Sequence, residues 1–157
     1  LVDFDKVDIT NLNRQQYDIA DLGTLKTDAL TKNIKRFNPF IEITSQCVKV
    51  NEDNAAEIFG GYKIVCEAFD KAENKAMLVN SILSEYGDTK IVSGSGMAGF
   101  GSSNTIVTRK INDRFYLCGD AESDMNDGLA LVAPRVAICA AHEANMILRL
   151  LIGEKEV

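Results

Sequence analysis

Acidic, amide and basic side chains follow one another through the opening of the chain, which reads L-V-D-F-D-K-V-D-I-T-N-L-N-R. Asp3 and Asp5 fit the end of a buried strand, where a carboxylate can accept two hydrogen bonds from a ribose diol. Arg14 follows on a short polar connection and would reach the same carboxyl edge of the sheet, where open α/β sheets bind ligands. Acids after an apolar residue also start turns, so on Asp3 alone a nucleotide site and a turn are equally open.

Lys26 is the next candidate for binding phosphate. A helix is predicted from Thr24 to Phe37, because apolar residues recur at helical spacing, Thr24 can cap the helix and Asn38-Pro39 ends it. Lys26 falls in the first turn, where the helix dipole disfavours a cation. A solvent-exposed surface tolerates such a lysine, but a phosphate-binding site requires one. We interpret Lys26 as a phosphate-binding residue, with the surface position as the alternative.

Asp70 closes a short apolar run at residues 62–69, which predicts a central parallel strand covered on both faces. Because the carboxyl ends of parallel strands lie at one edge of a sheet, Asp70 could hold a magnesium ion that bridges phosphates. It could equally cap the helix predicted from Ala72 to Tyr86, and both roles can hold at once.

The remaining hydrophobic patterns complete an α/β fold. Strands are expected at 40–50, 89–93, 104–110 and 114–118, and helices at 53–59 and 134–152. The strands at 104–110 and 114–118 are joined at Asn112-Asp113 as a hairpin. These elements predict a Rossmann-like fold, with a mainly parallel sheet, helices on both faces and an added antiparallel hairpin.

Two loops contain sequence patterns that resemble those of other binding sites. Gly94, Gly96 and Gly99 match G-x-G-x-x-G, but that fingerprint requires a helix at its last glycine, and the continuation here favours a strand. We predict a flexible crossing loop, with a nicotinamide or flavin site second. Residues 119–128 carry four carboxylates, but Met125 stands where a calcium-binding EF-hand loop requires glycine, so a mobile, solvated loop is preferred.

Composition bounds the remaining possibilities. The chain has 157 residues, of which 46% are hydrophobic and 25% charged, as expected for a single domain. Its net charge of −6 argues against a nucleic-acid surface, and no apolar stretch free of charge indicates a membrane span or signal, so we expect a cytoplasmic protein. The four cysteines form no C-x-x-C pair, and the one histidine, His142, lacks a metal-binding pattern. We therefore expect no zinc and a structural role for His142.

Four ordered blocks resemble the adenylyltransferases that activate ubiquitin-like sulfur carriers, the ThiF, MoeB and ubiquitin-activating superfamily. They are D-F-D-x-V-D-x-T-N-L-N-R-Q at 3–15, G-x-x-K at 23–26, N-P at 38–39 and E-A-F-D at 67–70. The run from Glu67 to Leu78 is most similar to the short, zinc-free ThiF-like proteins of thiamine biosynthesis. In that family a Gly-rich phosphate loop and its helix precede the strand that ends at Asp3. We therefore expect residues 1–157 to be a single ThiF-like domain that lacks this segment and, alone, binds ATP weakly or not at all.

The resemblance implies an ATP-dependent adenylyltransferase that uses magnesium and acts on the C-terminal glycine of a ThiS-like carrier, as a homodimer. It would bind ATP through Asp3, Thr10, Asn11, Arg14, Lys26 and Asp70. Arg14 and Asp70 would be catalytic, with Asp70 also holding the metal. Cys118, at a predicted strand end, is a candidate thiol for attack on the acyl-adenylate, and a buried structural thiol is the equal alternative.

Two other classes of function remain open. The first is a non-catalytic module that binds a carrier protein or a nucleotide, and its motivation is the missing Gly-rich loop. The second is a nicotinamide-dependent oxidoreductase, which rests only on Gly94 to Gly99 and requires a helix after Gly99.

Overall fold

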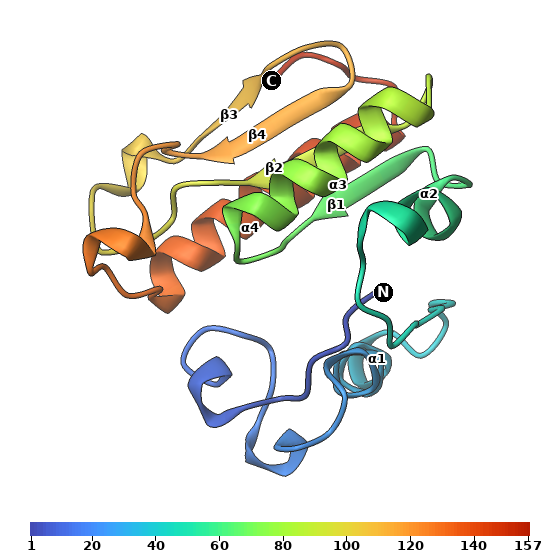
Figure 1. Ribbon diagram of the computed structural model, residues 1–157. Coiled ribbons are helices and arrows are strands. Elements are labelled where there is room, and N and C mark those ends of the chain that lie inside the picture. Colours follow the sequence, from blue (N-terminus) through green and yellow to red (C-terminus); the bar gives the residue numbers. More distant parts are fainter. The chain divides into compact units, whose positions relative to one another are not determined.

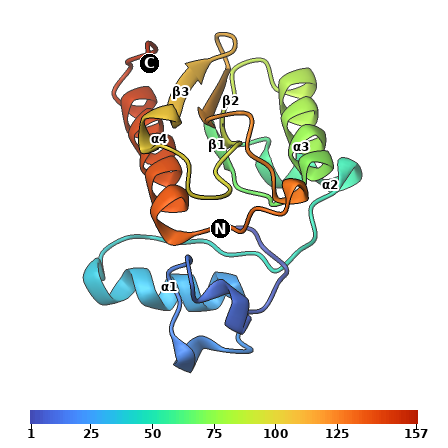
Figure 2. The same cartoon turned by 90° about the vertical axis from the view of Figure 1, so that its left-hand side faces the viewer.

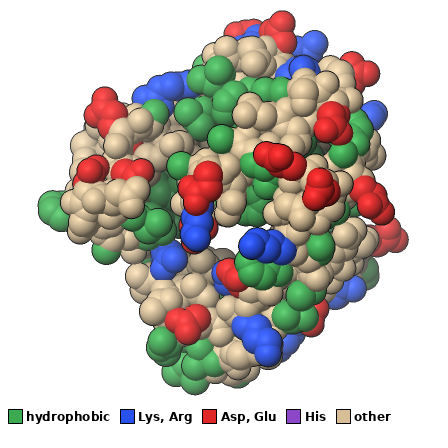
Figure 3. All heavy atoms as spheres, viewed as in Figure 1, with side chains coloured by type: hydrophobic (Ala, Val, Ile, Leu, Met, Phe, Trp, Pro, Cys, Tyr) green, Lys and Arg blue, Asp and Glu red, His purple; other side chains and the backbone are tan.

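The computed structural model describes residues 1–157 and divides them into two compact units, residues 1–50 and residues 51–157. That all 157 residues form one domain stays a prediction. Residues 1–50 hold seven Lys or Arg and seven Asp or Glu, so the net charge of −6 belongs to residues 51–157. On the face shown in Figure 3, basic side chains lie singly or in small groups among acidic ones. An anion that approaches residues 1–50 therefore meets no net negative charge from that unit.

Residues 1–50 contain one α-helix and two 3₁₀-helices connected by irregular chain (Figure 1). These elements are η1 (Ile9–Asn11), η2 (Ile19–Asp21) and α1 (Lys26–Phe37). An antiparallel bridge joins Lys6 to Leu25 and ties the segment after Asp3 to the start of α1. Val7, Thr27 and Ala29 are buried beside this bridge, so the start of α1 is held by packing as well as by hydrogen bonds.

The start of α1 differs from the sequence prediction. The helix begins at Lys26, and Leu25 precedes it without any side-chain cap. Thr24 does not cap the helix, because its hydroxyl donates to the backbone oxygen of Asp21 at 2.6 Å and its own backbone oxygen accepts from Val7. The predicted cap at Thr24 is therefore wrong, although the end of the helix at Phe37 is confirmed.

The strand predicted at residues 40–50 is also wrong. This segment makes a single parallel bridge, between Gln46 and Val2. The backbone N–H of Asp3 donates to Gln46 at 3.2 Å, and that of Gln46 donates to Leu1 at 2.9 Å. Only Leu1 to Asp3 run beside the segment, so its alternating β-branched residues have too short a partner to extend the ladder.

Residues 51–157 form a four-stranded sheet with helices on both faces (Figures 1 and 2). The strand order is β1-β2-β4-β3, with β1, β2 and β4 parallel and β3 antiparallel to β4. The elements are α2 (Glu52–Phe59), β1 (Ile64–Glu67), α3 (Ala72–Glu85), β2 (Lys90–Gly94), η3 (Ser103–Thr105), β3 (Val107–Lys110), β4 (Phe115–Gly119), η4 (Met125–Asp127) and α4 (Ala133–Leu151). The Rossmann-like α/β prediction, including the added hairpin, is confirmed.

The two long helices bury opposite faces of this sheet. Helix α3 packs on β1 and β2, and α4 lies across all four strands on the other face. The core under α4 contains Val92, Tyr116, Cys118, Cys139, Met146 and Leu150. Strand β1 has a hydrogen-bonded neighbour on one side only, so the prediction of a central strand is wrong within this sheet. Its apolar run arises because helices pack on both of its faces, not because strands flank it on both edges.

The start of α4 and the end of α2 follow their sequence signals. Asn51 caps α2 in a reciprocal pair with Asn54, and Gly60 follows the helix where an added Cβ would lie 2.5 Å from the ring of Tyr86. Pro134 occupies the first turn of α4, where its missing N–H has no partner to lose. None of the helices has the length and apolarity that crossing a bilayer requires.

Candidate functional site

Lys26 and the two aspartates at the start of the chain lie together. The backbone N–H of Lys26 donates to Asp5 at 3.0 Å, which places the lysine opposite the acidic segment as α1 begins. Its ammonium lies 2.9 Å from a carboxylate oxygen of Asp5 and 3.9 Å from one of Asp3. The lysine side chain is 14% exposed, whereas those of Asp3 and Asp5 are 38% and 50% exposed. The structure thus groups two predicted ATP-binding residues, with Asp5 holding the cation that the helix dipole disfavours.

Asp8 organises the segment that carries Thr10, Asn11 and Arg14. Its carboxylate accepts from the backbone N–H of Thr10 at 2.9 Å and from the Thr10 hydroxyl at 2.7 Å, and these bonds lower its pKa. The amide oxygen of Asn11 in turn accepts from the Asp8 backbone at 2.9 Å. This reciprocal cap shapes η1, so Thr10 and Asn11 have a local structural role in addition to the predicted nucleotide contact.

Arg14 is held by one end of its guanidinium. Its Nη1 donates to the backbone oxygen of Thr10 at 2.8 Å and to the Asn13 side chain at 2.9 Å. Guanidinium groups have five N–H donors, and those on Nη2 and Nε make no hydrogen bond here. Arg14 therefore has a fixed position and free donors, the combination that an anion-binding arginine needs.

Asp21 is a buried polar residue that the sequence analysis missed. Its carboxylate accepts from Lys32 at 3.0 Å, from the Asn33 amide at 2.9 Å and from the Asp18 backbone at 3.1 Å. The hydrogen bonds from Asn33, Asp18 and Lys32 lower the pKa of Asp21 to about 2. The signal in the sequence was D-x-x-D at 18–21, because Asp18 caps η2 reciprocally with Asp21.

We predict that Asp21→Asn lowers the stability of the protein in a pH-dependent way. The folded-state pKa of about 2 lies below the ordinary aspartate pKa of 3.8, so the ionised carboxylate stabilises the fold at pH values above 3.8. That contribution is lost as the pH falls through about 2. Thermal unfolding of both proteins should show a gap in midpoint that is constant above pH 3.8 and closes toward pH 2. Asp28→Asn, at an exposed position on α1, is the control, and a gap as large for it would count against the assignment.

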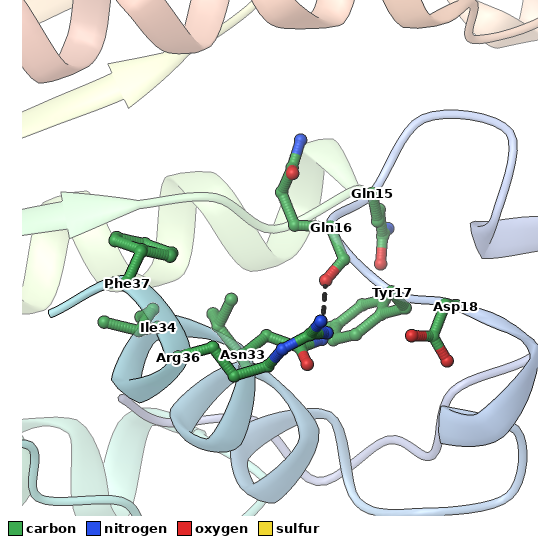
Figure 4. Close-up of a pocket in the computed structure, with 9 residues that line it drawn as sticks. Gln15, Gln16, Tyr17, Asp18, Asn33, Ile34, Arg36 and Phe37 are labelled. Carbon is green, nitrogen blue, oxygen red and sulfur yellow. Dashed lines mark hydrogen bonds between the residues drawn. The ribbon is translucent and has the colours of Figure 1, made fainter. Parts of the chain in front are cut away.

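A pocket of about 760 Å³ lies between α1 and the loop after Arg14 (Figure 4). It is lined by Gln15, Gln16, Tyr17, Asp18, Leu30, Asn33, Ile34, Arg36 and Phe37. Asn33 crosses it to donate to the backbone oxygen of Gln16 at 3.0 Å, the bond drawn in Figure 4. Burial raises the pKa of Tyr17 to about 12, so its phenol stays protonated. None of the predicted site residues lines this pocket.

Asp70 lies in the other unit, in the loop between β1 and α3. Its side chain is exposed and makes no hydrogen bond or ion pair. The N-cap of α3 is Lys71, without a side-chain bond, so the structure does not support the capping role for Asp70. A carboxylate without an internal partner at the end of a parallel strand fits an oxygen-preferring cation such as magnesium.

Cys118, the candidate thiol, is completely buried in the core under α4. Burial raises the pKa of its thiol, and the hydroxyl of Thr108, 3.6 Å from the sulfur, offsets this only in part. Thiols react as thiolates, so this environment disfavours attack on an acyl-adenylate and favours the structural alternative. The same core holds Cys139, whose thiol donates to Glu143 at 3.4 Å. His142 accepts or donates a 3.0 Å hydrogen bond with Thr108, in line with a structural role.

The glycine-rich loop and the acidic loop are bound to each other. Gly96 accepts from the Asp120 backbone at 2.9 Å, and the buried Arg135 contacts the Asp120 carboxylate at 2.5 Å. Arg135 also donates to the backbone oxygens of Gly101 and Ser102. No α-helix opens at Gly99, as expected for a crossing loop, and only the short 3₁₀-helix η3 follows before β3. The prediction of a mobile, solvated acidic loop is wrong at Asp120.

We predict that Gly119→Ala destabilises the protein strongly. Gly119 has φ +132°, and an added Cβ would lie 1.6 Å from the backbone oxygen of Ser95. Because backbone atoms cannot move aside cheaply, the loss in free energy of unfolding should be on the order of 3 kcal/mol. Gly128→Ala is the matched control, since φ is +78° there but the space is open, and should cost about 1 kcal/mol. Equal losses in chemical denaturation would refute the steric explanation.

Metal binding by protein side chains alone finds little support in the geometry. No group of three or more His, Cys, Asp or Glu side chains is arranged to hold a metal ion. A magnesium ion that bridges nucleotide phosphates needs few protein ligands, and Asp70 can supply one. The expectation that the protein carries no zinc stays a prediction.

A mostly parallel sheet between two helical layers, with polar residues at its strand ends, defines the Rossmann-like class of α/β proteins. Within that class, the ThiF family model matches residues 1–157. The chain therefore belongs to the ThiF family, as its motif blocks predict.

Curated relatives include the adenylyltransferase and sulfurtransferase UBA4 of Saccharomyces cerevisiae. It is 27% identical over 161 residues, which cover 98% of this chain and 36% of that protein. UBA4 of Scheffersomyces stipitis is 37% identical over 98 residues, or 62% of this chain and 22% of that protein. The chain thus spans about a third or less of the length of these relatives.

Solved structures share the fold at low sequence identity. E. coli tRNA N6-threonylcarbamoyladenosine dehydratase, TcdA, in complex with AMP has a TM-score of 0.82 at 20% identity, over 96% of this chain and 74% of that one. E. coli MccB with AMPCPP and MccA has a TM-score of 0.65 at 18% identity, over 98% and 48% of the two chains. At these identities the similarity shows the fold alone.

Proposed function

We propose that the chain is the nucleotide-binding part of an ATP-dependent adenylyltransferase that activates the C-terminal glycine carboxylate of a ubiquitin-like sulfur-carrier protein. Membership of the ThiF family over residues 1–157 supports the reaction class. UBA4 is named as an adenylyltransferase, and TcdA and MccB structures contain AMP or an ATP analogue. The observation that carries the proposal is the grouping of Lys26 with Asp3 and Asp5, a cation and two carboxylates of the types that a nucleotide requires.

The chemistry matches the residues that are available. A carboxylate oxygen of the carrier's last glycine attacks the α-phosphorus of ATP, and pyrophosphate leaves. The attacking group is already ionised, so no general base is needed, and catalysis is mainly positioning and neutralisation of charge. We assign ribose binding to Asp3, with Asp5 keeping Lys26 in place as Asp3 turns to the nucleotide.

The phosphates would be neutralised by basic and polar side chains of the predicted site. Lys26 supplies an ammonium, Arg14 its free Nη2 and Nε donors, and Thr10 and Asn11 polar contacts to the nucleotide. Magnesium, when bound, would neutralise further phosphate charge, and Asp70 would hold it and face the reacting carboxylate. Cys118 is assigned no step, because its thiol is buried and its pKa is raised.

We further propose a ThiS-like carrier, thiamine thiazole biosynthesis and a homodimer. The run from Glu67 to Leu78 supports the pathway, since it resembles the ThiF-like proteins linked to thiamine biosynthesis. The exposed side of α4 supports the homodimer, because it presents apolar residues at helical spacing without a charge among them. These residues are Ala137, Ala141, Ala144, Leu148 and Leu151.

The test is exchange of labelled pyrophosphate into ATP by the full-length protein, with magnesium and a ThiS-like protein ending in Gly-Gly. We expect exchange that requires the Gly-Gly tail, and none with a carrier from which the last glycine is removed. Binding of ATP without exchange would indicate another substrate or a nucleotide-binding module. Failure to bind ATP would leave only the carrier-binding module.

A further inference from the structure

Glu67, the last residue of β1, is a buried carboxylate that the motif assignments leave unexplained. Its side chain is 1% exposed and lies on the face of the sheet that α3 covers. The strand register pairs Glu67 with Ser93 of β2, whose hydroxyl donates to the carboxylate. The ammonium of Lys75, on the first turns of α3, lies 3.2 and 3.3 Å from the two carboxylate oxygens. Burial of a charge is costly unless it is paired and hydrogen-bonded, and here both conditions are met.

A third donor connects this carboxylate to the predicted site. The backbone N–H of Phe69 donates to Glu67 at 2.5 Å. This hydrogen bond holds residues 68–70 in the connection between β1 and α3. Asp70 directly follows Phe69 in that connection. The Asp70 carboxylate itself is exposed and makes no bond that could fix it. The place of Asp70 is therefore set through Phe69 by Glu67.

We propose that Glu67 is a positioning residue, which with Ser93 and Lys75 fixes the β1–α3 loop and so determines where Asp70 presents its carboxylate. This inference rests on the proposed function, in which Asp70 holds magnesium and faces the reacting carboxylate. Glu67 acts only through the loop and touches neither ATP nor the carrier. Lys75 compensates the Glu67 charge, and Ser93 holds the second carboxylate oxygen.

The first measurement needs no ligand. Hydrogen exchange of the Phe69 amide, followed by NMR in the full-length protein, should be about tenfold faster in Glu67→Gln, because the acceptor is weaker and Lys75 loses its partner. The amide of Val65, in the middle of β1, should keep its wild-type rate. Glu73→Gln is the control, since Glu73 is an exposed glutamate on the first turn of α3. It should change neither amide.

The second measurement separates positioning from binding. In pyrophosphate exchange, Glu67→Gln should lower kcat about tenfold and leave KM for ATP within about twofold, because a displaced Asp70 impairs the reaction more than it impairs binding. Lys75→Arg, which keeps the cation, should retain most of the activity that Lys75→Met loses. If Glu67→Gln does not fold, the same two measurements on Ser93→Ala test the inference. This substitution removes one donor to Glu67 and keeps the charge pair of Glu67 with Lys75.

Three results overturn the inference. In the first, the Phe69 amide of Glu67→Gln shows the same hydrogen-exchange rate as that of Glu73→Gln. In the second, Glu67→Gln loses kcat although hydrogen exchange at Phe69 is no faster. In the third, hydrogen exchange becomes faster by the same factor at Val65 and at Phe69. In each case, inactive Asp70→Ala protein would leave the proposed function standing. Full activity of Asp70→Ala would instead refute the role of Asp70 in the proposed function.

Discussion

Pyrophosphate exchange should fall at least about a hundredfold when Asp70 is replaced by alanine in the full-length protein, with little change in the melting temperature. Removing a preorganised group that stabilises charge in the transition state typically costs a factor of 10² to 10³. Stability should hold because the Asp70 side chain is exposed and makes no hydrogen bond or ion pair, so its loss leaves no group unsatisfied. Steady-state exchange rates and thermal unfolding of the same preparations check both parts.

Glu73→Ala is the matched control for this prediction. Glu73 is an exposed acid three residues further on, in the first turn of α3. The substitution Glu73→Ala therefore removes the same charge from the same region. It should keep wild-type exchange. Asp70→Asn should resemble Asp70→Ala, since an amide oxygen is a weaker ligand for magnesium than a carboxylate. Pyrophosphate exchange by Asp70→Ala at more than half the wild-type rate would show that Asp70 has no part in the mechanism.

Lys26→Met should weaken ATP binding by about tenfold to a hundredfold. A charge-assisted hydrogen bond contributes roughly 1.5–3 kcal/mol, which corresponds to this range. The substitution also leaves Asp3 and Asp5 without their cation, so their negative charges would repel the phosphates. Both carboxylates are substantially exposed, so the fold should lose little stability. Isothermal calorimetry with ATP measures the affinity.

The control for Lys26 lies on the same helix. Lys35 is exposed on the last turn of α1 and makes no ion pair, so Lys35→Met removes an equal charge without touching the acidic segment. Its ATP affinity should equal that of the wild type. If Lys26→Met binds ATP normally but melts at a lower temperature, Lys26 is a structural partner of Asp5 and not a phosphate ligand.

Local patterns predicted most of the fold correctly. The helices from 72 and 134 onward, the hairpin of β3 and β4 and the crossing loop at Gly94 to Gly101 follow from apolar spacing and glycine content, which act over short distances. The strand predicted at 40–50 failed because a strand exists only where a partner runs beside it, and pairing is not a local property. The edge position of β1 was missed for the same reason.

The site residues were predicted from their residue types, but the side chains that pair with them or fix their positions were not predicted. Asp3 and Lys26 were predicted separately, and their ion pairing depends on the antiparallel bridge between Lys6 and Leu25. Asp21 and Glu67 were missed because a buried carboxylate looks like any surface acid until its donors are known. A usable signal did exist for Glu67, since a charged residue inside an otherwise apolar strand needs a buried partner.

Mass spectrometry of the carrier protein tests the central claim most directly. A ThiS-like protein ending in Gly-Gly is mixed with the full-length protein, ATP and magnesium, without a sulfur donor, and its mass is compared before and after. We predict a gain of one adenylyl group on the C-terminal glycine, absent with Asp70→Ala and absent from a carrier without its last glycine. An unchanged carrier mass across ubiquitin-like carriers, in samples where ATP is bound, would show that this protein is not an adenylyltransferase of such carriers.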